Sequence, residues 1–381
     1  MYKILCSGMG IGSEATGIAE YIRETVSLLC RHHRVDLLLP EKEISGFKVE
    51  SSNLKIIPVP DKYASGKRNW WWHLLLPFNM PMGDYDFVFL PAGNRRLFWS
   101  YPRPTIITVH DLSPFYFPES GGRIKKNFLR YLISRLLRKV QIIMAISEST
   151  KNDLIDCYRL PPERVIVNYN GFDSARYYPD PCHDEAEILK KLHLESGYIL
   201  YIARIEHPVK NHLNLLKAYE MLPEWLKKNH PLVCAGNLWR NWEKPVNYAE
   251  NSLDRSRLLF PGFVPEEWLP CLYRNAALYV FPSFYEGFGI PLLEAMSCGI
   301  PIACSNRSSL PEVGGGAVIT FDPESPESIR NAMQSILTDP VLRNELVRKG
   351  YNRKEDFSWQ KHTDNIIAAY EKYCVGKGKM S

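Results

Sequence analysis

Short apolar runs, each bounded by glycine, proline or charged residues, recur along the whole chain and alternate with longer amphipathic stretches. Such runs are typical of strands buried on both faces of a parallel sheet, and the stretches between them predict helices. The expected strands are 2–6, 34–39, 54–59, 87–90, 105–109, 141–146, 164–167, 198–203, 231–235, 257–260, 277–281 and 301–304. Strands that alternate with helices predict βαβ units with parallel sheets.

The pattern changes near residue 174, where prolines and charged residues interrupt it, and a second alternating series begins at Tyr198. This predicts an amino-terminal domain over 1–173, a linker with a helix over 174–196 and a carboxyl-terminal domain over 197–358. A length of 381 residues suits two domains that each bury a core. The cleft between two such domains is the expected ligand site.

Composition places the chain among globular proteins, with 45% hydrophobic and 23% charged residues. No apolar run approaches the roughly 20 residues that span a bilayer. The chain starts directly as a strand, without the apolar segment of a signal peptide, so we expect a cytoplasmic protein. Nine scattered cysteines without a C-x-x-C pair predict reduced thiols rather than disulfides or a structural zinc site.

Positive charge is concentrated in the first half of the chain. Residues 1–172 contain 23 Lys and Arg against 16 Asp and Glu, a net charge of +7, whereas the remainder has a net charge of −2. The first half is therefore expected to face an anionic partner.

The stretch from Phe284 to Pro301 carries two carboxylates, Glu286 and Glu294, across a predicted strand end, glycine turn and helix start. Glycines on both sides of Phe288 let the backbone pass close to a ligand, and the free N–H groups of a helix start favour an anion or sugar hydroxyls. An ordinary strand-to-helix turn with a capping glutamate is the structural alternative. Paired carboxylates also raise the possibility of acid/base hydrolysis.

Arg204 follows a predicted strand and Lys210 lies six residues further on. Both can converge on a phosphate from one loop, Arg as a planar fork and Lys as a point charge. Solvated surface charges are the alternative.

Two further candidates lie in the first half. The loop after the first strand contains several glycines and resembles a phosphate-binding turn. It lacks the G-x-G-x-x-G spacing of a dinucleotide site, and a tight turn without a ligand explains it equally well. His110 and Asp111 stand where the strand 105–109 ends, a position where open α/β sheets bind ligands. A structural role for this pair is an equal alternative.

Residues 121–140 combine seven basic residues and no acidic ones with an apolar helical stripe. The helix can lie on anionic lipid headgroups or bind a pyrophosphate-linked acceptor, and a solvated face of a sheet-covering helix is the alternative. Nucleic acid is not expected, because no recognised module accompanies the charge. The aromatic run around Trp71 suggests a membrane interface or acceptor contact, against the simpler reading of a helix packed on the sheet.

Together these motifs resemble the retaining glycosyltransferases of family 4, which have the GT-B fold. The resemblance rests on Glu286-x7-Glu294 within Gly-Phe-Gly-Ile-Pro and Glu-Ala-Met-x-x-Gly-x-Pro, on Arg204 with Lys210, on His110-Asp111 and on Asn170-Gly-x-Asp173. It covers nearly the whole chain in the right order. It implies two Rossmann-like domains facing across a deep cleft, with the last helical stretch, 359–381, returning to the amino-terminal domain.

The resemblance also implies the roles of individual residues. Arg204 and Lys210 stabilise the departing diphosphate, Glu286 holds the sugar hydroxyls, and His110 contacts the donor sugar near the reacting carbon. The other implied donor-binding residues are Thr16, Gly17, Val264, Gly287, Phe288, Gly289, Ile290 and Glu294, the last of them on the ribose. Weaker acceptor or membrane candidates are Trp71, Arg123, Lys125 and Lys126.

The implied reaction moves a sugar from a GDP- or UDP-linked donor to a glycan or polyprenyl-diphosphate-linked acceptor, without metal or other cofactor. Bacterial surface polysaccharide, such as O-antigen, capsule or exopolysaccharide, is the expected product, and the enzyme is expected on the inner face of the membrane. A sugar-nucleotide epimerase, a phosphorylase and a noncatalytic nucleotide-sugar binding module are the alternatives. The sequence assigns no oligomeric state.

Overall fold

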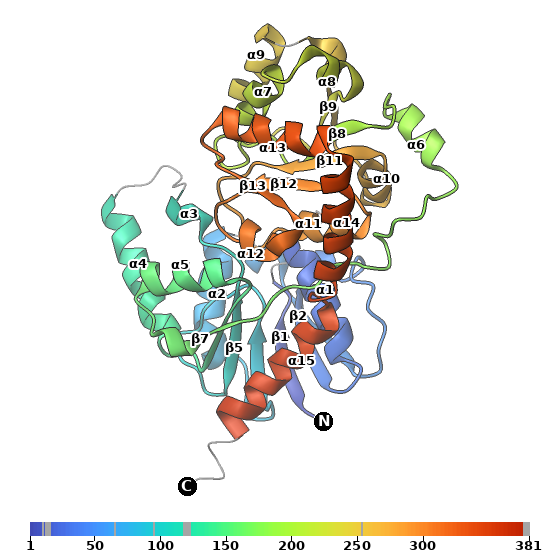
Figure 1. The fold of residues 1–381 in the computed structure, drawn as a ribbon. Helices are drawn as coiled ribbons and strands as arrows, with labels where there is room; N and C mark the ends of the chain where they lie inside the picture. The colour runs from blue at the N-terminus through green and yellow to red at the C-terminus, as the bar shows by residue number, and fades with distance from the viewer. Residues whose placement is uncertain are drawn as a thin grey trace. The chain divides into compact units, whose positions relative to one another are not determined.

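The computed structural model describes residues 1–9, 11, 17–64, 66–93, 96–116, 123–252 and 254–375. It divides into two compact units. Unit 1 comprises Met1–Gly171 and Ser358–Ser381, and unit 2 comprises Phe172–Phe357. Both are α/β units built on a parallel sheet (Figure 1).

Unit 1 contains a seven-stranded sheet of order β3-β2-β1-β4-β5-β6-β7, in which every described pair is parallel. Its strands are β1 (Lys3–Ser7), β2 (Arg34–Pro40), β3 (Leu54–Val59), β4 (Phe87–Leu90), β5 (Thr105–Val109), β6 (Ile142–Ala145) and β7 (Val165–Val167). Its helices are α1 (Gly17–Leu29), α2 (Gly66–Asn79), α3 (Ser113–Tyr116), α4 (Arg123–Leu137), α5 (Glu148–Tyr158) and α15 (Trp359–Tyr370).

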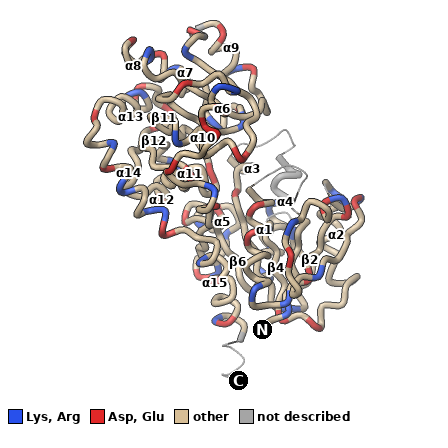
Figure 2. The backbone as a smooth tube through the Cα atoms, turned by 90° about the vertical axis from the view of Figure 1, so that its right-hand side faces the viewer, with Lys and Arg blue, Asp and Glu red and all other residues tan. Residues whose placement is uncertain are grey.

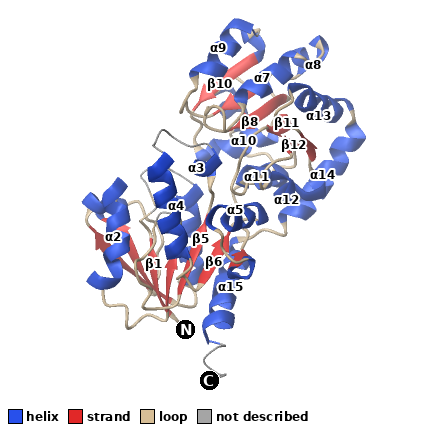
Figure 3. Cartoon of the chain, turned by 90° about the vertical axis from the view of Figure 1, so that its left-hand side faces the viewer, coloured by secondary structure: helices blue, strands red, loops and turns tan. Residues whose placement is uncertain are grey.

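Helices cover both faces of this sheet (Figure 3). Successive strand residues point to opposite faces, so Leu5 packs with α2, α4 and α5, whereas Ile4 and Cys6 pack with α1 and α15. Burial on both faces explains why the strands are apolar without alternation.

Helix α15 is part of the unit 1 core, as the family resemblance implies. Trp359, Ile366 and Tyr370 are buried in the same cluster as α1. A Cβ atom on Gly171 would lie 2.1 Å from the backbone nitrogen of Trp359, so only glycine permits this close approach. His362 lies between Tyr169 O, 2.9 Å from its Nδ1, and the Tyr21 hydroxyl, 2.8 Å from its Nε2.

Unit 2 contains a six-stranded parallel sheet of order β10-β9-β8-β11-β12-β13. Its strands are β8 (Tyr198–Ile202), β9 (Leu232–Ala235), β10 (Leu258–Gly262), β11 (Ala276–Phe281), β12 (Ile302–Ser305) and β13 (Ile319–Phe321). Its helices are α6 (Glu185–Lys191), α7 (His212–Glu220), α8 (Glu224–Asn229), α9 (Glu243–Ser252), α10 (Leu269–Arg274), α11 (Ile290–Ser297), α12 (Leu310–Gly314), α13 (Pro326–Thr338) and α14 (Pro340–Lys354).

The predicted class of two α/β units with parallel sheets is confirmed, and each predicted strand coincides with an observed one. The short β13 has no counterpart among the predicted strands. The segment 174–196, predicted as a linker with a helix, contains α6 and belongs to unit 2, where Arg274 forms an ion pair with Glu185. Among the described residues, no helix combines the length and the apolar character needed to cross a membrane.

In each sheet the strand order reverses beside the first strand. The reversal falls between β1 and β4 in unit 1 and between β8 and β11 in unit 2. Open α/β sheets bind ligands beyond the carboxyl ends of the strands at this point. In unit 2 the segments that follow these two strands carry Arg204, Lys210 and Glu286.

Candidate active site

The turn from β11 into α11 is held by its backbone. Gly289 caps the helix with φ of 105°, a conformation that favours glycine, and a Cβ atom there would lie 2.8 Å from Leu310 Cδ2. The backbone N–H of Glu286 donates to Ser308 Oγ at 3.2 Å. Ser309 Oγ lies 2.9 Å from Glu286 O and 2.7 Å from Phe288 O. The backbone on both sides of Gly287 is thereby fixed at the start of the helix.

Lys210 and Glu286 form an ion pair in this turn. Lys210 Nζ lies 2.7 Å from Glu286 Oε1, and the two side chains are only 18% and 15% exposed. The Tyr201 hydroxyl, from β8, donates to Lys210 O at 2.7 Å. The next residue, Asn211, donates to Pro282 O at 3.0 Å and so ties this loop to the end of β11. The structure therefore brings together two residues that the sequence separates by 76 positions.

Arg204 has different neighbours. Its guanidinium carbon lies 4.8 Å from the ring centroid of Trp239, and Nη2 lies 3.8 Å from Glu206 Oε2. The side chain is 55% exposed, so its charge is accessible to a ligand from solvent. The expected convergence of Arg204 and Lys210 on one phosphate stays a prediction.

Glu294 lies on α11 among buried tyrosines. The Tyr273 hydroxyl, from α10, donates to Glu294 Oε2 at 2.8 Å. Burial raises the pKa of Glu294 to about 7, while Tyr273, Tyr177 and the charge of Arg176 oppose this shift and Glu266 adds to it. Arg176 is itself held by Asp173 at 3.2 Å and Glu266 at 3.0 Å. This carboxyl group therefore changes charge near neutral pH.

The raised pKa of Glu294 predicts a loss of stability with rising pH. The group titrates near 4.5 in the unfolded chain and near 7 in the folded protein. Between these values the unfolded chain releases a proton that the folded protein keeps, so the free energy of unfolding falls as pH rises through this window. The loss should amount to roughly 3 kcal/mol, since each pKa unit corresponds to about 1.4 kcal/mol.

Urea denaturation of the wild-type protein and of Glu294→Gln at several pH values measures this loss. The difference between the two proteins is expected to change between pH 4.5 and pH 7 and to be constant above that. Tyr273→Phe should extend the window to higher pH, because the hydroxyl stabilises the ionised carboxylate. A difference in free energy of unfolding between the two proteins that is independent of pH would contradict the raised pKa of Glu294.

The remaining residues of unit 2 that are predicted to bind the sugar donor lie around the turn from β11 into α11 or beyond β10. Phe288 is buried against Phe357, with ring centroids 5.7 Å apart. Ile290 opens α11, and Val264 is buried two residues after β10. Their backbone contacts with a donor stay predictions.

In unit 1, His110 and Asp111 do not act on the same partner. His110 Nε2 donates to Pro91 O at 2.6 Å, and the ring lies edge-on to Tyr21 at 4.6 Å. Asp111 Oδ1 accepts from Ser113 N at 3.0 Å and from Ser113 Oγ at 2.7 Å, at the start of α3. Burial lowers the pKa of His110, so the imidazole is neutral at pH 7 and Nδ1 is its acceptor atom.

The other unit 1 candidates are only partly described. Gly17 is exposed at the first position of α1, whereas Thr16 lies outside the described residues. Arg123, Lys125 and Lys126 lie in the first turn of α4, and their side chains are likewise outside the description. Trp71 is 56% exposed on α2, which packs on the sheet through Leu74 and Leu76. The aromatic run thus forms a sheet-covering helix that also presents Trp71 to solvent.

Sequence reasoning missed several residues that position the site, namely Tyr201, Trp239, Tyr273, Ser308 and Ser309. The tyrosines occur in apolar runs and resemble ordinary core residues. The serine pair follows β12, next to β11 in the sheet, and a polar pair at that strand end is the signal that identifies it.

Comparison with known proteins identifies the family. Residues 15–176 match the family model described as "Glycosyltransferase Family 4", and residues 184–353 match "Glycosyl transferases group 1". The chain is 35% identical over 269 residues to the O-antigen chain mannosyltransferase B of Escherichia coli, which covers 70% of each protein. The chain belongs to glycosyltransferase family 4.

Two further similarities concern a second relative and the fold. The glycosyltransferase is 34% identical over 284 residues to the serotype-specific mannosyltransferase WbdA of Escherichia coli, covering 73% of this chain but 34% of that longer protein. Its fold matches sucrose-phosphate synthase from Thermosynechococcus elongatus with a TM-score of 0.74 at 17% identity, over 99% of this chain and 100% of the other. The glycosyltransferase thus has the GT-B fold.

Proposed function

We propose that this glycosyltransferase moves a mannosyl residue from a GDP- or UDP-linked donor to a glycan or polyprenyl-diphosphate-linked acceptor during assembly of a bacterial surface polysaccharide. The observation that carries the proposal is the largely buried Lys210–Glu286 pair at the start of α11, in a chain whose curated relatives include O-antigen mannosyltransferases. A cation and a carboxylate side by side suit a substrate that combines a diphosphate with a sugar.

The proposed roles follow from charge and position. Lys210 and the exposed Arg204 stabilise the negative charge that develops on the diphosphate as the sugar leaves. The carboxylate of Glu286 accepts hydrogen bonds from the sugar hydroxyls, and the backbone N–H groups around Gly287 donate hydrogen bonds to them. Val264 places backbone groups against the base. Glu294 accepts hydrogen bonds from the ribose hydroxyls, and the ionised carboxylate is the stronger acceptor. Donor affinity should therefore rise as the pH increases through about 7.

The proposed reaction retains the anomeric configuration. The bond between C1 of the sugar and the diphosphate oxygen breaks, and the acceptor oxygen forms a bond to C1 on the same face. The acceptor proton passes to an oxygen of the leaving diphosphate, so no protein side chain is needed as general base. His110, neutral at pH 7, and Gly17 are proposed to contribute donor contacts from unit 1.

We further propose that the reaction proceeds without metal. Two basic side chains can take the place of a cation at the diphosphate, and no cluster of three or more potential metal ligands occurs within the described ranges. Activity is expected to be unchanged after extensive dialysis against a chelator, as measured by product formation. A loss that Mg²⁺ or Mn²⁺ restores would overturn this part of the proposal.

The central test supplies GDP-mannose, and in parallel UDP-linked hexoses, with a mannose-terminated acceptor oligosaccharide. The expected result is a product longer by one sugar whose new linkage, read by NMR, has the same anomeric configuration as the donor. Incubation of each donor alone tests for an epimerised nucleotide sugar. Binding of every donor without transfer would contradict the proposed activity.

A peripheral contact with an anionic membrane surface is proposed as well. On α2, three large apolar side chains at helical spacing are exposed, Trp71 by 56%, Leu75 by 47% and Phe78 by 64%. They share with basic α4 one face of the sheet. Aromatic side chains beside basic ones suit a membrane interface. Neutralising Arg123, Lys125 and Lys126 together should reduce sedimentation with anionic vesicles. Unchanged sedimentation would indicate that the basic residues of α4 are solvated and do not bind the membrane.

A further inference from the structure

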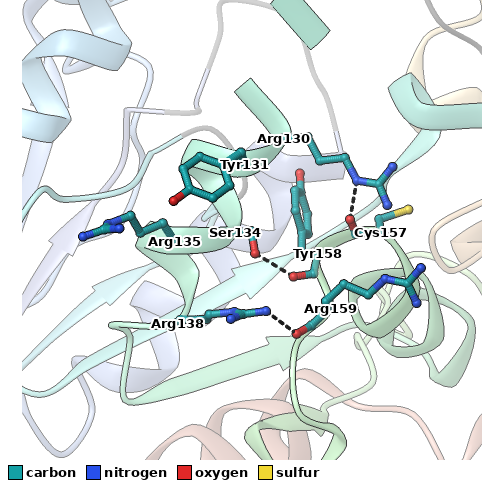
Figure 4. A pocket seen from close by; sticks show the side chains of 8 residues that line it. All are labelled: Arg130, Tyr131, Ser134, Arg135, Arg138, Cys157, Tyr158 and Arg159. Atoms are coloured by element: carbon teal, nitrogen blue, oxygen red, sulfur yellow. Dashed lines mark hydrogen bonds between the residues drawn. The ribbon is translucent and has the colours of Figure 1, made fainter. Parts of the chain in front are cut away.

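A pocket of about 460 Å³ lies between α4 and α5 of unit 1 (Figure 4). It is lined by Arg130, Tyr131, Ser134, Arg135, Arg138, Cys157, Tyr158 and Arg159. Four of these eight residues are arginines and none is acidic. Over most of the chain, Lys and Arg alternate with Asp and Glu (Figure 2).

Two of the arginines are held in place by the end of α5. Arg130 Nε donates to Cys157 O at 2.5 Å, and its guanidinium carbon lies 5.9 Å from the ring centroid of Phe115. Arg138 Nη2 donates to Arg159 O at 2.9 Å. Ser134 Oγ donates to Tyr158 O at 2.6 Å between them. The last carbonyls of α5 are thereby satisfied, and each guanidinium retains further N–H donors.

Capping of α5 does not account for the other two arginines. Within the part of the chain that the structure describes, the side chains of Arg135 and Arg159 have no hydrogen bond or ion pair. In Figure 4, Arg130 and Arg159 lie on the side of Cys157. Arg135 and Tyr131 lie on the other side of the hydrogen bond between Ser134 and Tyr158. The lining therefore carries four positive charges and no acidic residue, which favours an anion.

The two arginines that follow α4 and α5 lie away from the proposed donor contacts of unit 1. Arg138 and Arg159 precede the amino ends of β6 and β7, whereas His110 follows the carboxyl end of the adjacent parallel strand β5. The two edges are separated by the length of a strand, on the order of 15 Å for four or five residues. Arg138 and Arg159 therefore lie about a strand's length from His110, whereas Arg130 lies beside Phe115 of α3.

We infer that this arginine pocket binds phosphate groups. Guanidinium groups form paired hydrogen bonds with phosphate oxygens, and those already fixed by α5 lose little further freedom on binding. The phosphates belong either to lipid headgroups or to a soluble phosphate or diphosphate compound. The inference is independent of the proposed transfer reaction, because none of the pocket residues has a role in it.

The experiment uses the whole chain and two probes, inorganic pyrophosphate followed by calorimetry, and vesicles of phosphatidylcholine with or without phosphatidic acid followed by sedimentation. Arg135→Gln combined with Arg159→Gln is expected to weaken at least one probe's binding about tenfold. The matched control, Arg31→Gln combined with Arg34→Gln, removes two exposed charges elsewhere on unit 1 and should have little effect. Arg135→Lys combined with Arg159→Lys should restore binding in part, because a point charge replaces the fork.

The two probes separate the sources. Pyrophosphate binding that the pocket variant loses assigns a soluble phosphate compound, and vesicle binding alone assigns lipid headgroups. Pyrophosphate can also bind to the donor site, and the pocket variant leaves that binding unchanged. The difference between the wild-type protein and the pocket variant therefore reports binding to the pocket alone. Equal losses in the pocket variant and the control, or no binding of either probe to the wild-type protein, would overturn the inference. Arg135→Gln alone provides the test if the double variant has a lowered unfolding temperature.

Discussion

Replacing Lys210 by alanine is expected to lower kcat/KM for sugar transfer by 10²- to 10³-fold, the typical effect of removing a group that stabilises charge developing in the transition state. The ammonium group lies 2.7 Å from Glu286 and has little exposure to solvent, so water replaces it poorly. Steady-state kinetics with a saturating acceptor measures the effect. Most of the loss should appear in kcat, because the charge on the diphosphate increases as the bond to the sugar breaks.

An exposed ion pair of the same unit provides the matched control. Lys191 Nζ lies 2.7 Å from Glu187 Oε1 on α6, with side chains 54% and 65% exposed. Lys191→Ala should leave kcat/KM unchanged. Lys210→Arg retains the charge but changes its geometry and should recover part of the activity. Near-normal turnover of Lys210→Ala would contradict the assignment of the diphosphate site.

Glu286→Ala is expected to abolish detectable transfer, and Glu286→Gln to lower kcat/KM by about 10- to 100-fold, as loss of a charged hydrogen bond implies. The fold should survive both changes, because Ser308 and Ser309 bind the backbone of Glu286 rather than its carboxylate. Kinetics and thermal unfolding of each variant, with Glu187→Gln as the control, measure these effects. Activity of Glu286→Ala close to wild type would remove Glu286 from the site.

The two residues should also be energetically coupled. Once Lys210 is absent, the carboxylate of Glu286 has lost its partner and part of its orientation, so its removal costs less than in the wild-type protein. The combined loss in Lys210→Ala with Glu286→Gln is therefore expected to be smaller than the product of the two separate losses. Independent, multiplicative losses would indicate that the two side chains act at separate places.

The fold was predictable because strands buried on both faces of a parallel sheet leave continuous apolar runs, as in Ala276–Phe281. The exception is β13, where three residues follow a run of glycines and give too short a signal. The segment 174–196 was predicted as a linker because it is charged and contains proline. Its attachment to unit 2 depends on Glu185 and Arg274, which lie 89 positions apart, and local pattern contains no information on such a pair.

For the candidate site, the sequence indicated the residues that carry chemistry but not those that orient them. Glu286 and Lys210 stand at strand ends, where polar residues are noticeable against apolar runs. Tyr273 occurs in a buried helical turn and acts on Glu294 from 21 positions away, so its contact depends on how α10 packs against α11. The partners of Arg204 likewise follow from the approach of the loops after β8 and β9.

The place of α15 in unit 1 has a consequence for biosynthesis. When a ribosome has released residues 1–171, all seven strands of the first sheet exist, but one of its faces still lacks the apolar surface of Trp359, Ile366 and Tyr370. That surface emerges only after the whole of unit 2 has been translated. The half of the protein that is made first is therefore completed last, and one apolar face of its sheet is exposed to water in the interval.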